Sequence, residues 1–122
     1  MYRDMVWAAA EALNLNMLAP RENASPSVTA IKSPEGIEAG DIIGGMLRDF
    51  NVVVAGGQGQ LKGKIFRIGH LGYVDGLDLM SGISALEMTL SRLGCSVEIG
   101  AGVKAAEQVI RGRMETNASI DN

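Results

Sequence analysis

The stretch that most constrains the fold of this chain is GGQGQLKGKIFRIGHLGY, residues 56–73. It joins a glycine-rich turn to a short apolar strand, and Arg67 stands in the middle of that strand. Because side chains alternate across a pleated strand, Phe66 and Ile68 point one way while Ile65 and Arg67 point the other. A guanidinium between apolar neighbours requires an anion as its partner. That anion is either a structural carboxylate, which is the commoner case, or the carboxylate of a ligand.

The segment before this stretch contains two predicted helices and one strand. Apolar residues at helical spacing predict a helix over residues 2–18, which Pro20 ends. The first helix would bury Val6, Ala9, Ala10, Leu13 and Met17. The short β-rich run Val28–Lys32 lies between prolines and predicts a strand. A helix entry at residues 33–35 then predicts a second helix to about Asp49. Its expected buried residues are Ile43, Met46, Leu47 and Phe50.

The segment around the glycine-rich turn predicts a hairpin and a long helix. Val52–Ala55 is expected to be a strand that pairs antiparallel with the arginine strand through the loop 56–63. The long helix follows, with Asp75 as its cap, Asp78 in its first turn and Gly94 as a left-handed end. Its apolar stripe comprises Leu79, Ile83, Leu86, Leu90 and Leu93.

The remaining residues complete the predicted fold. A brief edge strand is expected over Ser96–Ile99 and a last helix from Gly102 to about Arg113, while polar residues 115–122 are expected to form a disordered tail. The last helix would turn Val103, Ala106 and Ile110 inward. The element order predicts an α+β fold, a two-layer sandwich with helices packed on one face of a small, mostly antiparallel sheet. That domain would span residues 28–114. Its other sheet face must meet water, another domain or another chain.

Composition excludes several classes of function. A net charge of -3 and a pI near 5.1 argue against a nucleic-acid partner. No apolar run approaches the roughly 20 residues of a membrane span, so no membrane partner is expected. With one histidine, His70, and one cysteine, Cys95, the usual zinc ligand set cannot form, and both are interpreted as structural. A single cysteine also favours a reducing, cytoplasmic location.

The glycine-rich loop does not match a phosphate-binding loop. The spacing is not G-x-x-x-x-G-K, no serine or threonine follows Lys64, and a strand follows instead of a helix. The loop is therefore interpreted as a hairpin connection. Lys62 and Lys64 are expected to be solvated, and they could steer an acidic substrate toward Arg67 by long-range attraction.

The stretch VVVAGGQGQLKGKIFRIGHLGYV, followed by a long helix and a shorter one, resembles the C-terminal small domain of class V aminotransferases. These are pyridoxal-phosphate enzymes of fold type I. The resemblance covers roughly Val28–Arg111, and its specific core is GG-x-G, then GK, then RIG-x-LG. The nearest group resembles alanine–glyoxylate and serine–glyoxylate aminotransferases, some cyanobacterial members of which are labelled soluble hydrogenase small subunits.

This resemblance implies a role for Arg67, since the arginine of RIG grips the substrate α-carboxylate in the family. It also implies pyridoxal 5'-phosphate, small amino acids and 2-oxo acids such as glyoxylate as substrates, and a homodimer in the full-length enzyme. In the family the cofactor is bound by a large domain, so residues 1–27 would be a helix and connection that follow a missing large domain.

The resemblance places no catalytic or cofactor-binding residue in this chain. Its lysines do not lie in the family's Schiff-base context; they are Lys32, Lys62, Lys64 and Lys104. The chain alone is therefore expected to be inactive. Two alternatives are a stand-alone ferredoxin-like module that binds an amino acid and a pure assembly domain. Apolar residues at 52–54 and 65 on the face away from the helices would argue against a stand-alone module, which needs a polar open face.

Overall fold

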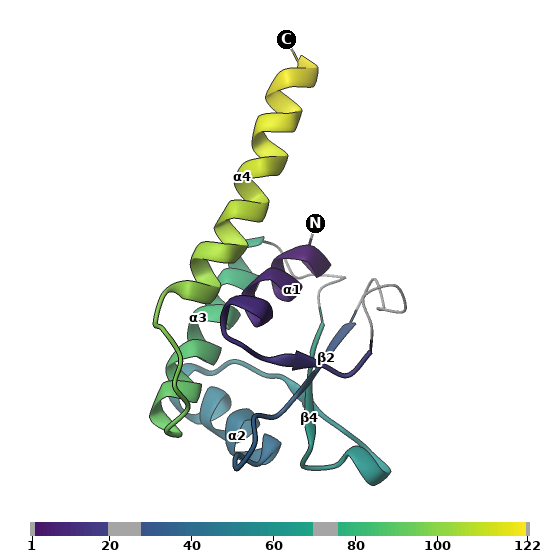
Figure 1. The fold of residues 1–122 in the computed structure, drawn as a ribbon, viewed down its shortest axis with the longest axis vertical. Helices are drawn as coiled ribbons and strands as arrows, with labels where there is room; N and C mark the ends of the chain where they lie inside the picture. Colours follow the sequence, from purple (N-terminus) through teal and green to yellow (C-terminus); the bar gives the residue numbers. More distant parts are fainter. Residues whose placement is uncertain (1, 20–27, 70–75, 122) are drawn as a thin grey trace.

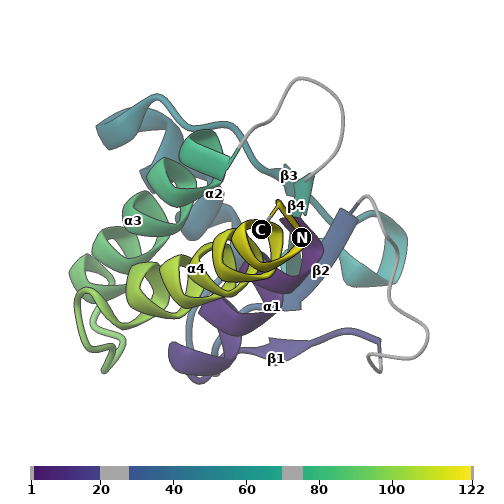
Figure 2. The ribbon, with the colours of Figure 1, turned by 90° about the horizontal axis from the view of Figure 1, so that it is seen from above.

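The fold is a four-stranded antiparallel sheet with the helices gathered on one of its sides (Figures 1 and 2). A computed structural model describes residues 2–19, 28–69 and 76–121. Its elements, in chain order, are α1 (Tyr2–Ala12), β1 (Asn16–Met17), β2 (Val28–Lys32), α2 (Ala39–Phe50), β3 (Ala55–Gly56), β4 (Ile65–Gly69), α3 (Gly76–Arg92) and α4 (Ala101–Asp121). The strand order is β1-β2-β4-β3, and every neighbouring pair is antiparallel. The predicted α+β class is confirmed.

The register of β2 against β4 sorts the side chains of the two central strands into two faces. Ile31 lies opposite Phe66, and both are buried in the main core. One residue along, Ala30 lies opposite Arg67, on the face that points away from the core. Strand β2 has the predicted bounds, and the predicted alternation of Phe66 and Arg67 is confirmed.

Helix α1 ends six residues earlier than predicted, at Ala12. Leu15 donates its backbone N–H to the carbonyl of Ala10 at 2.8 Å, and Asn14 between them has a φ of 59°. Asparagine tolerates this left-handed conformation better than most residues, so it ends the helix before Pro20 can. Asn16 then pairs with Lys32 to begin β1. Within the shorter helix the predicted inward face is confirmed, because Val6, Ala9 and Ala10 are buried, as is Leu13 just after it.

Helix α2 begins at Ala39 rather than at the predicted entry. The Ser33 backbone N–H donates to the Lys64 carbonyl at 2.8 Å, and its hydroxyl donates to the Ile37 carbonyl. These bonds tie residues 33–38 into a turn beside β4, so Ser33 does not cap the helix.

The buried face of α2 is turned relative to the prediction. Met46 is buried as expected, but Leu47 is 50% exposed. The buried face instead includes Gly45, where an added Cβ would lie 2.9 Å from Cγ2 of Thr89 on α3. Contact through a glycine lets the two helices approach closely, and this approach fixes which face of α2 points inward.

Charged side chains join the ends of α2 and α3. Asp49 accepts hydrogen bonds from Arg48, at 3.1 Å from Nε, and from Arg92 on α3. The hydrogen bond from Arg48, followed by that from Arg92, holds the pKa of the Asp49 carboxyl below its ordinary value. The cluster is largely exposed, so it is a surface clamp rather than a buried ion pair.

Two strand predictions need correction. The predicted strand over residues 52–55 is only Ala55–Gly56, although Ala55 pairs antiparallel with Arg67, which confirms the hairpin. The predicted edge strand Ser96–Ile99 is irregular. This connection runs beside the helices, on the side away from the sheet, so it has no strand edge to pair with (Figures 1 and 2).

Helix α3 follows its predicted pattern. Its stripe is buried from Leu79 to Leu90, and the helix ends at Arg92, two residues before Gly94, which has a φ of 90°. The Cys95 N–H donates to the Leu90 carbonyl at 2.9 Å, as expected for a left-handed helix end. The predicted cap Asp75 lies outside the described residues.

Helix α4 is longer than predicted and extends beyond the rest of the molecule (Figure 1). It continues to Asp121 through most of the segment for which the sequence predicts a disordered tail. No glycine or proline follows Gly112 to end it, and Arg111 pairs with Glu115 one turn later at 3.2 Å. As predicted, Ala106 is buried and Val103 and Ile110 pack against the core. None of the described helices is long and apolar enough to cross a membrane.

Candidate functional site

Arg67 occupies the centre of β4, on the sheet face that points away from the helices. Its direct neighbours across the sheet are Ala30 on β2 and Ala55 on β3. An alanine side chain is a single methyl group, so neither neighbour can cover the guanidinium or hydrogen-bond to it. Arg67 is half-buried.

The guanidinium of Arg67 makes one hydrogen bond within the described part of the chain. Its Nε–H donates to the backbone carbonyl of Gly56, at 2.9 Å. Among the described residues, the ion pairs involve other arginines, and none of the described carboxylates lies within ion-pair distance of Arg67. Of the two anions that the sequence left open, the structural carboxylate thus has no candidate among the described residues.

The glycine-rich loop folds back over the start of β4. It contains a 3₁₀ turn, Gly59–Leu61, and the Lys64 N–H closes it by donating to the Leu61 carbonyl at 3.0 Å. Ile65 was expected to share the open face with Arg67, but this loop covers it and only 3% of it is exposed. A Cβ added at Gly57 would lie 2.7 Å from Cγ1 of Ile65, which shows how closely the loop approaches the strand.

The described residues do not form a site for pyridoxal phosphate. An aldimine lysine must be enclosed beside the cofactor, whereas each lysine of this chain is exposed. The lysines are Lys32, Lys62, Lys64 and Lys104. The described residues also contain no cluster of three or more histidine, cysteine or acidic side chains suited to a metal ion. Cys95 is half-buried after the end of α3, and His70 lies outside the described residues.

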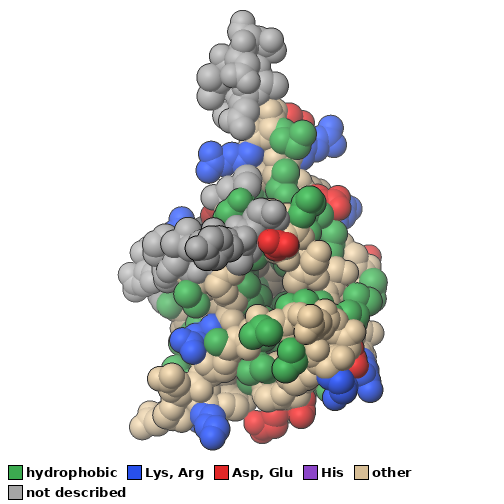
Figure 3. All heavy atoms as spheres, turned by 180° about the vertical axis from the view of Figure 1, so that it is seen from behind, with side chains coloured by type: hydrophobic (Ala, Val, Ile, Leu, Met, Phe, Trp, Pro, Cys, Tyr) green, Lys and Arg blue, Asp and Glu red, His purple; other side chains and the backbone are tan. Residues whose placement is uncertain are grey.

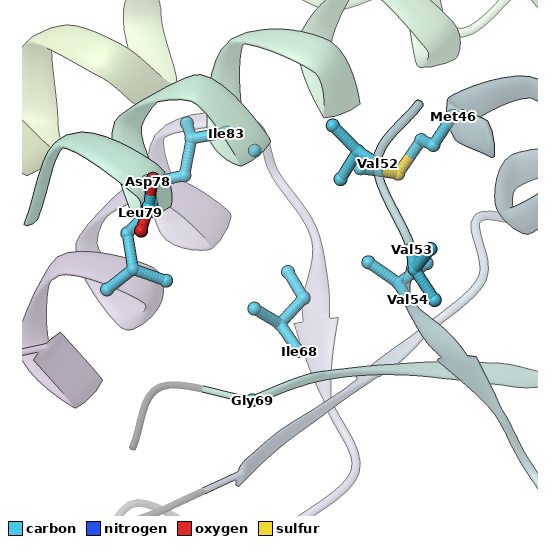
Figure 4. A pocket seen from close by; sticks show the side chains of 10 residues that line it. Met46, Val52, Val53, Val54, Ile68, Gly69, Asp78, Leu79 and Ile83 are labelled. Carbon is cyan, nitrogen blue, oxygen red and sulfur yellow. The ribbon is translucent and has the colours of Figure 1, made fainter. Parts of the chain in front are cut away.

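A separate apolar cleft of about 180 Å³ lies on the helix side of the sheet. Figure 4 shows Ile68 of β4 between Leu79 and Ile83 of α3 and the valines of residues 52–54. Hydrophobic side chains also gather around a hollow on the back face of the molecule (Figure 3). Since Arg67 points to the opposite face from Ile68, the cleft is not part of a carboxylate site.

Residues 52–54 and 65, whose exposure was expected to distinguish a dependent domain from a stand-alone module, differ in how far they are buried. Val53 is 80% exposed, whereas Val52 and Val54 pack against the core and Ile65 is under the loop. Only Val53 of this set presents a large apolar surface to solvent. The sheet face around Arg67 therefore has the small side chains of Ala30 and Ala55 beside the guanidinium, with the exposed Val28 and Lys32 of β2 farther along it.

Sequence reasoning missed Glu87, a buried carboxylate with a structural role. Its Oε2 accepts the backbone N–H of Gly100 at 2.8 Å, and its Oε1 accepts that of Val103 at 2.9 Å. It thereby caps the N-terminus of α4 from the neighbouring helix. A signal was present, because Glu87 lies four residues after Ile83 and one residue after Leu86, on the buried side of α3.

Comparison with curated proteins finds relatives that are much longer than this chain. No protein-family model matches. The chain is 48% identical over 104 residues to the soluble hydrogenase small subunit of Synechococcus sp., across 84% of this chain and 27% of that protein. It is 41% identical over 107 residues to the L-aspartate–glyoxylate aminotransferase of Paracoccus denitrificans, across 87% of this chain and 27% of that protein. The chain thus spans about a quarter of the length of the curated relatives it matches.

Solved aminotransferase structures share the fold of this chain over part of their length. The pyridoxamine–pyruvate aminotransferase from Mesorhizobium loti matches 92% of this chain and 29% of its own, with a TM-score of 0.87 and 28% identity. The ureidoglycine–glyoxylate aminotransferase from Bacillus subtilis matches 90% of this chain and 29% of its own, with a TM-score of 0.86 and 28% identity. The homologues of this chain are therefore class V aminotransferases and soluble hydrogenase small subunits, and the chain has the fold of the aminotransferase C-terminal small domain.

Proposed function

We propose that this chain is the substrate-carboxylate-binding domain of a class V aminotransferase, and that Arg67 is the residue that binds. In the intact enzyme the substrates would be small amino acids and 2-oxo acids such as glyoxylate. The observation that carries the proposal is the half-buried guanidinium of Arg67, which has no carboxylate partner among the described residues. The names of similar proteins support the substrate class, because four of the curated relatives are named aspartate– or serine–glyoxylate aminotransferases.

The contribution of Arg67 would be to bind and orient. A planar guanidinium can donate two parallel N–H bonds to one carboxylate, and such charge-assisted pairs fix direction as well as distance. Holding the α-carboxylate would fix the position of the substrate's Cα–H bond, which is a positioning effect on the rate. Lys62 and Lys64, exposed on the neighbouring loop, would add long-range attraction for an anionic substrate.

The class V homologues depend on pyridoxal phosphate, and the described residues of this chain show no site for it. We place the cofactor in a large domain of the same longer protein, which would be a homodimer. The isolated chain is then inactive. Incubating it with pyridoxal phosphate and reducing with borohydride should label the exposed lysines weakly and without preference. One lysine labelled stoichiometrically, together with transaminase turnover, contradicts this part of the proposal.

The role of Arg67 is tested in the longer enzyme by substitution. Two charge-assisted hydrogen bonds contribute about 1.5–3 kcal/mol each and are not fully additive, so Arg67→Ala should lower kcat/KM for amino acids by roughly 10²–10³-fold. Arg67→Lys should recover only part of this loss, because an ammonium cannot reproduce the planar fork.

Lys64→Ala is the matched control for the substitution of Arg67. It removes the same charge from the same hairpin, at an exposed position that makes no side-chain hydrogen bond among the described residues. Its effect on kcat/KM should be small and should disappear at high salt. If kcat/KM of Arg67→Ala equals that of the unsubstituted enzyme, or is no lower than that of Lys64→Ala, Arg67 does not bind the substrate and its role is structural.

A further inference from the structure

The backbone carbonyl of Gly56 is the partner that orients Arg67. We propose that Gly56 and Gly57 act as positioning residues: they hold the guanidinium so that its two terminal amino groups, rather than its Nε edge, are presented to the bound anion. The inference rests on the proposed function, since it specifies how Arg67 would meet a carboxylate. It starts from the hydrogen bond of 2.9 Å between Arg67 Nε and the Gly56 oxygen.

A guanidinium has two edges that can bind a carboxylate through a pair of N–H groups. One edge combines Nε with one terminal nitrogen, and the other combines the two terminal nitrogens. In this structure the Nε–H is already donated to Gly56, so the first edge has lost one of its donors. The other edge, formed by the two terminal nitrogens, keeps both of its donors as far as the described residues are concerned. A bidentate carboxylate must therefore approach the tip of Arg67, on the side away from the carbonyl.

The same hydrogen bond also fixes the plane of the guanidinium. The Nε–H bond lies in that plane, and rotation about the bond between Cδ and Nε would swing it away from the Gly56 oxygen. Across the sheet, the nearest side chains on the same face are the methyl groups of Ala30 and Ala55. Neither can hydrogen-bond, so among the described residues the carbonyl of Gly56 is the group that holds the orientation of the guanidinium.

The position of that carbonyl depends on Gly57. The Gly56 oxygen belongs to the peptide group that links Gly56 to Gly57, so a shift at Gly57 moves it directly. An added Cβ at Gly57 would lie 2.4 Å from the backbone oxygen of Leu61 and 2.7 Å from Cγ1 of Ile65. The first of these contacts is with backbone, which cannot move aside as a side-chain tip can. Only glycine therefore allows the loop to fold over Ile65 and leave the carbonyl where Arg67 needs it.

The hydrogen bond can be detected by NMR in the unsubstituted 122-residue chain. A scalar coupling between Arg67 Nε and the carbonyl carbon of Gly56 should be measurable, with Arg67→Lys used to assign the Nε–H signal. Exchange of that proton with solvent should be slow. Loss of the bond in Gly57→Ala should accelerate its exchange by about tenfold or more, since the donor is charged.

Controls separate positioning from general damage. Gly44→Ala places its methyl group in open space on α2 and should leave the Nε–H exchange unchanged. In Gly57→Ala the backbone N–H of Phe66 should stay protected, which excludes global unfolding as the cause of faster exchange. The inference is overturned if the coupling is absent from the unsubstituted chain, or if folded Gly57→Ala exchanges its Nε–H no faster than Gly44→Ala. Because these readouts need no substrate, they can fail while Arg67 still binds a carboxylate, and they can succeed while it does not.

Discussion

Replacing Glu87 should weaken the junction between α3 and α4, because this carboxylate accepts two backbone N–H groups at the start of α4. Its distances are 2.8 Å to the Gly100 nitrogen and 2.9 Å to the Val103 nitrogen, and the residue is 2% exposed. In Glu87→Gln the amide oxygen can accept one of these bonds, and the other N–H then faces an amide NH₂. A hydrogen bond to a charged group contributes about 1.5–3 kcal/mol, and a charge at a helix N-terminus about 0.3–2 kcal/mol.

These terms are partly offset, because a neutral amide is easier to bury than a carboxylate. We therefore expect Glu87→Gln to lower the free energy of unfolding by about 2 kcal/mol, near the lower end of the range. At a typical urea slope this moves the unfolding midpoint down by about 1–2 M. Urea unfolding followed by circular dichroism measures it, with Glu107→Gln as a control that removes the same charge from an exposed site on α4. Equal midpoints for the two variants would refute the capping role of Glu87.

Three further outcomes follow from α2 and its contacts. Gly44→Ala faces open space in the middle of α2 and should stabilise the chain by up to about 1 kcal/mol, as read from urea midpoints. Gly45→Ala brings its methyl group 2.9 Å from Cγ2 of Thr89 and should destabilise by about 1–3 kcal/mol; equal effects at the two glycines would contradict the helix contact. Arg48 and Arg92 lower the pKa of Asp49 in the folded chain. The stabilisation from these ion pairs should therefore be present above the unfolded pKa of about 3.9 and should be lost as the pH falls below it. Asp49→Asn should remove this part of the pH dependence, as measured by urea midpoints at a series of acidic pH values. If the midpoints of Asp49→Asn fall with pH as steeply as those of the unsubstituted chain, the ion pairs of Asp49 do not contribute.

The sequence predicts those elements whose local pattern and tertiary environment agree. The stripe of α3 from Leu79 to Leu90 follows from spacing, and its termination just before Gly94 follows from the freedom of glycine at positive φ. The alternation of β4 predicts that Phe66 enters the core and Arg67 does not. Arg67 could be singled out because a charge on an apolar strand is unusual and stands out in any sequence.

Features set by contacts between distant segments could not be predicted in this way. The start of α2 depends on a backbone bond between Ser33 and Lys64, which no local pattern encodes. The burial of Ile65 depends on the path of the loop that covers it. Arg67 was predicted as an anion site. Its hydrogen bond to Gly56 could not be predicted, because it depends on how β3 pairs with β4.

The most direct test of the proposed role of Arg67 compares two substrates of the proposed full-length aminotransferase. One is an amino acid, and the other is an amine of the same length that lacks the carboxylate. Arg67→Ala should lower kcat/KM for the amino acid by roughly 10²–10³-fold and change that for the amine little, because the amine never makes the contact. The ratio of the two kcat/KM values should therefore collapse by nearly the whole of that factor. An equal loss for both substrates, which leaves the ratio unchanged, would contradict the assignment of Arg67 as the carboxylate-binding residue.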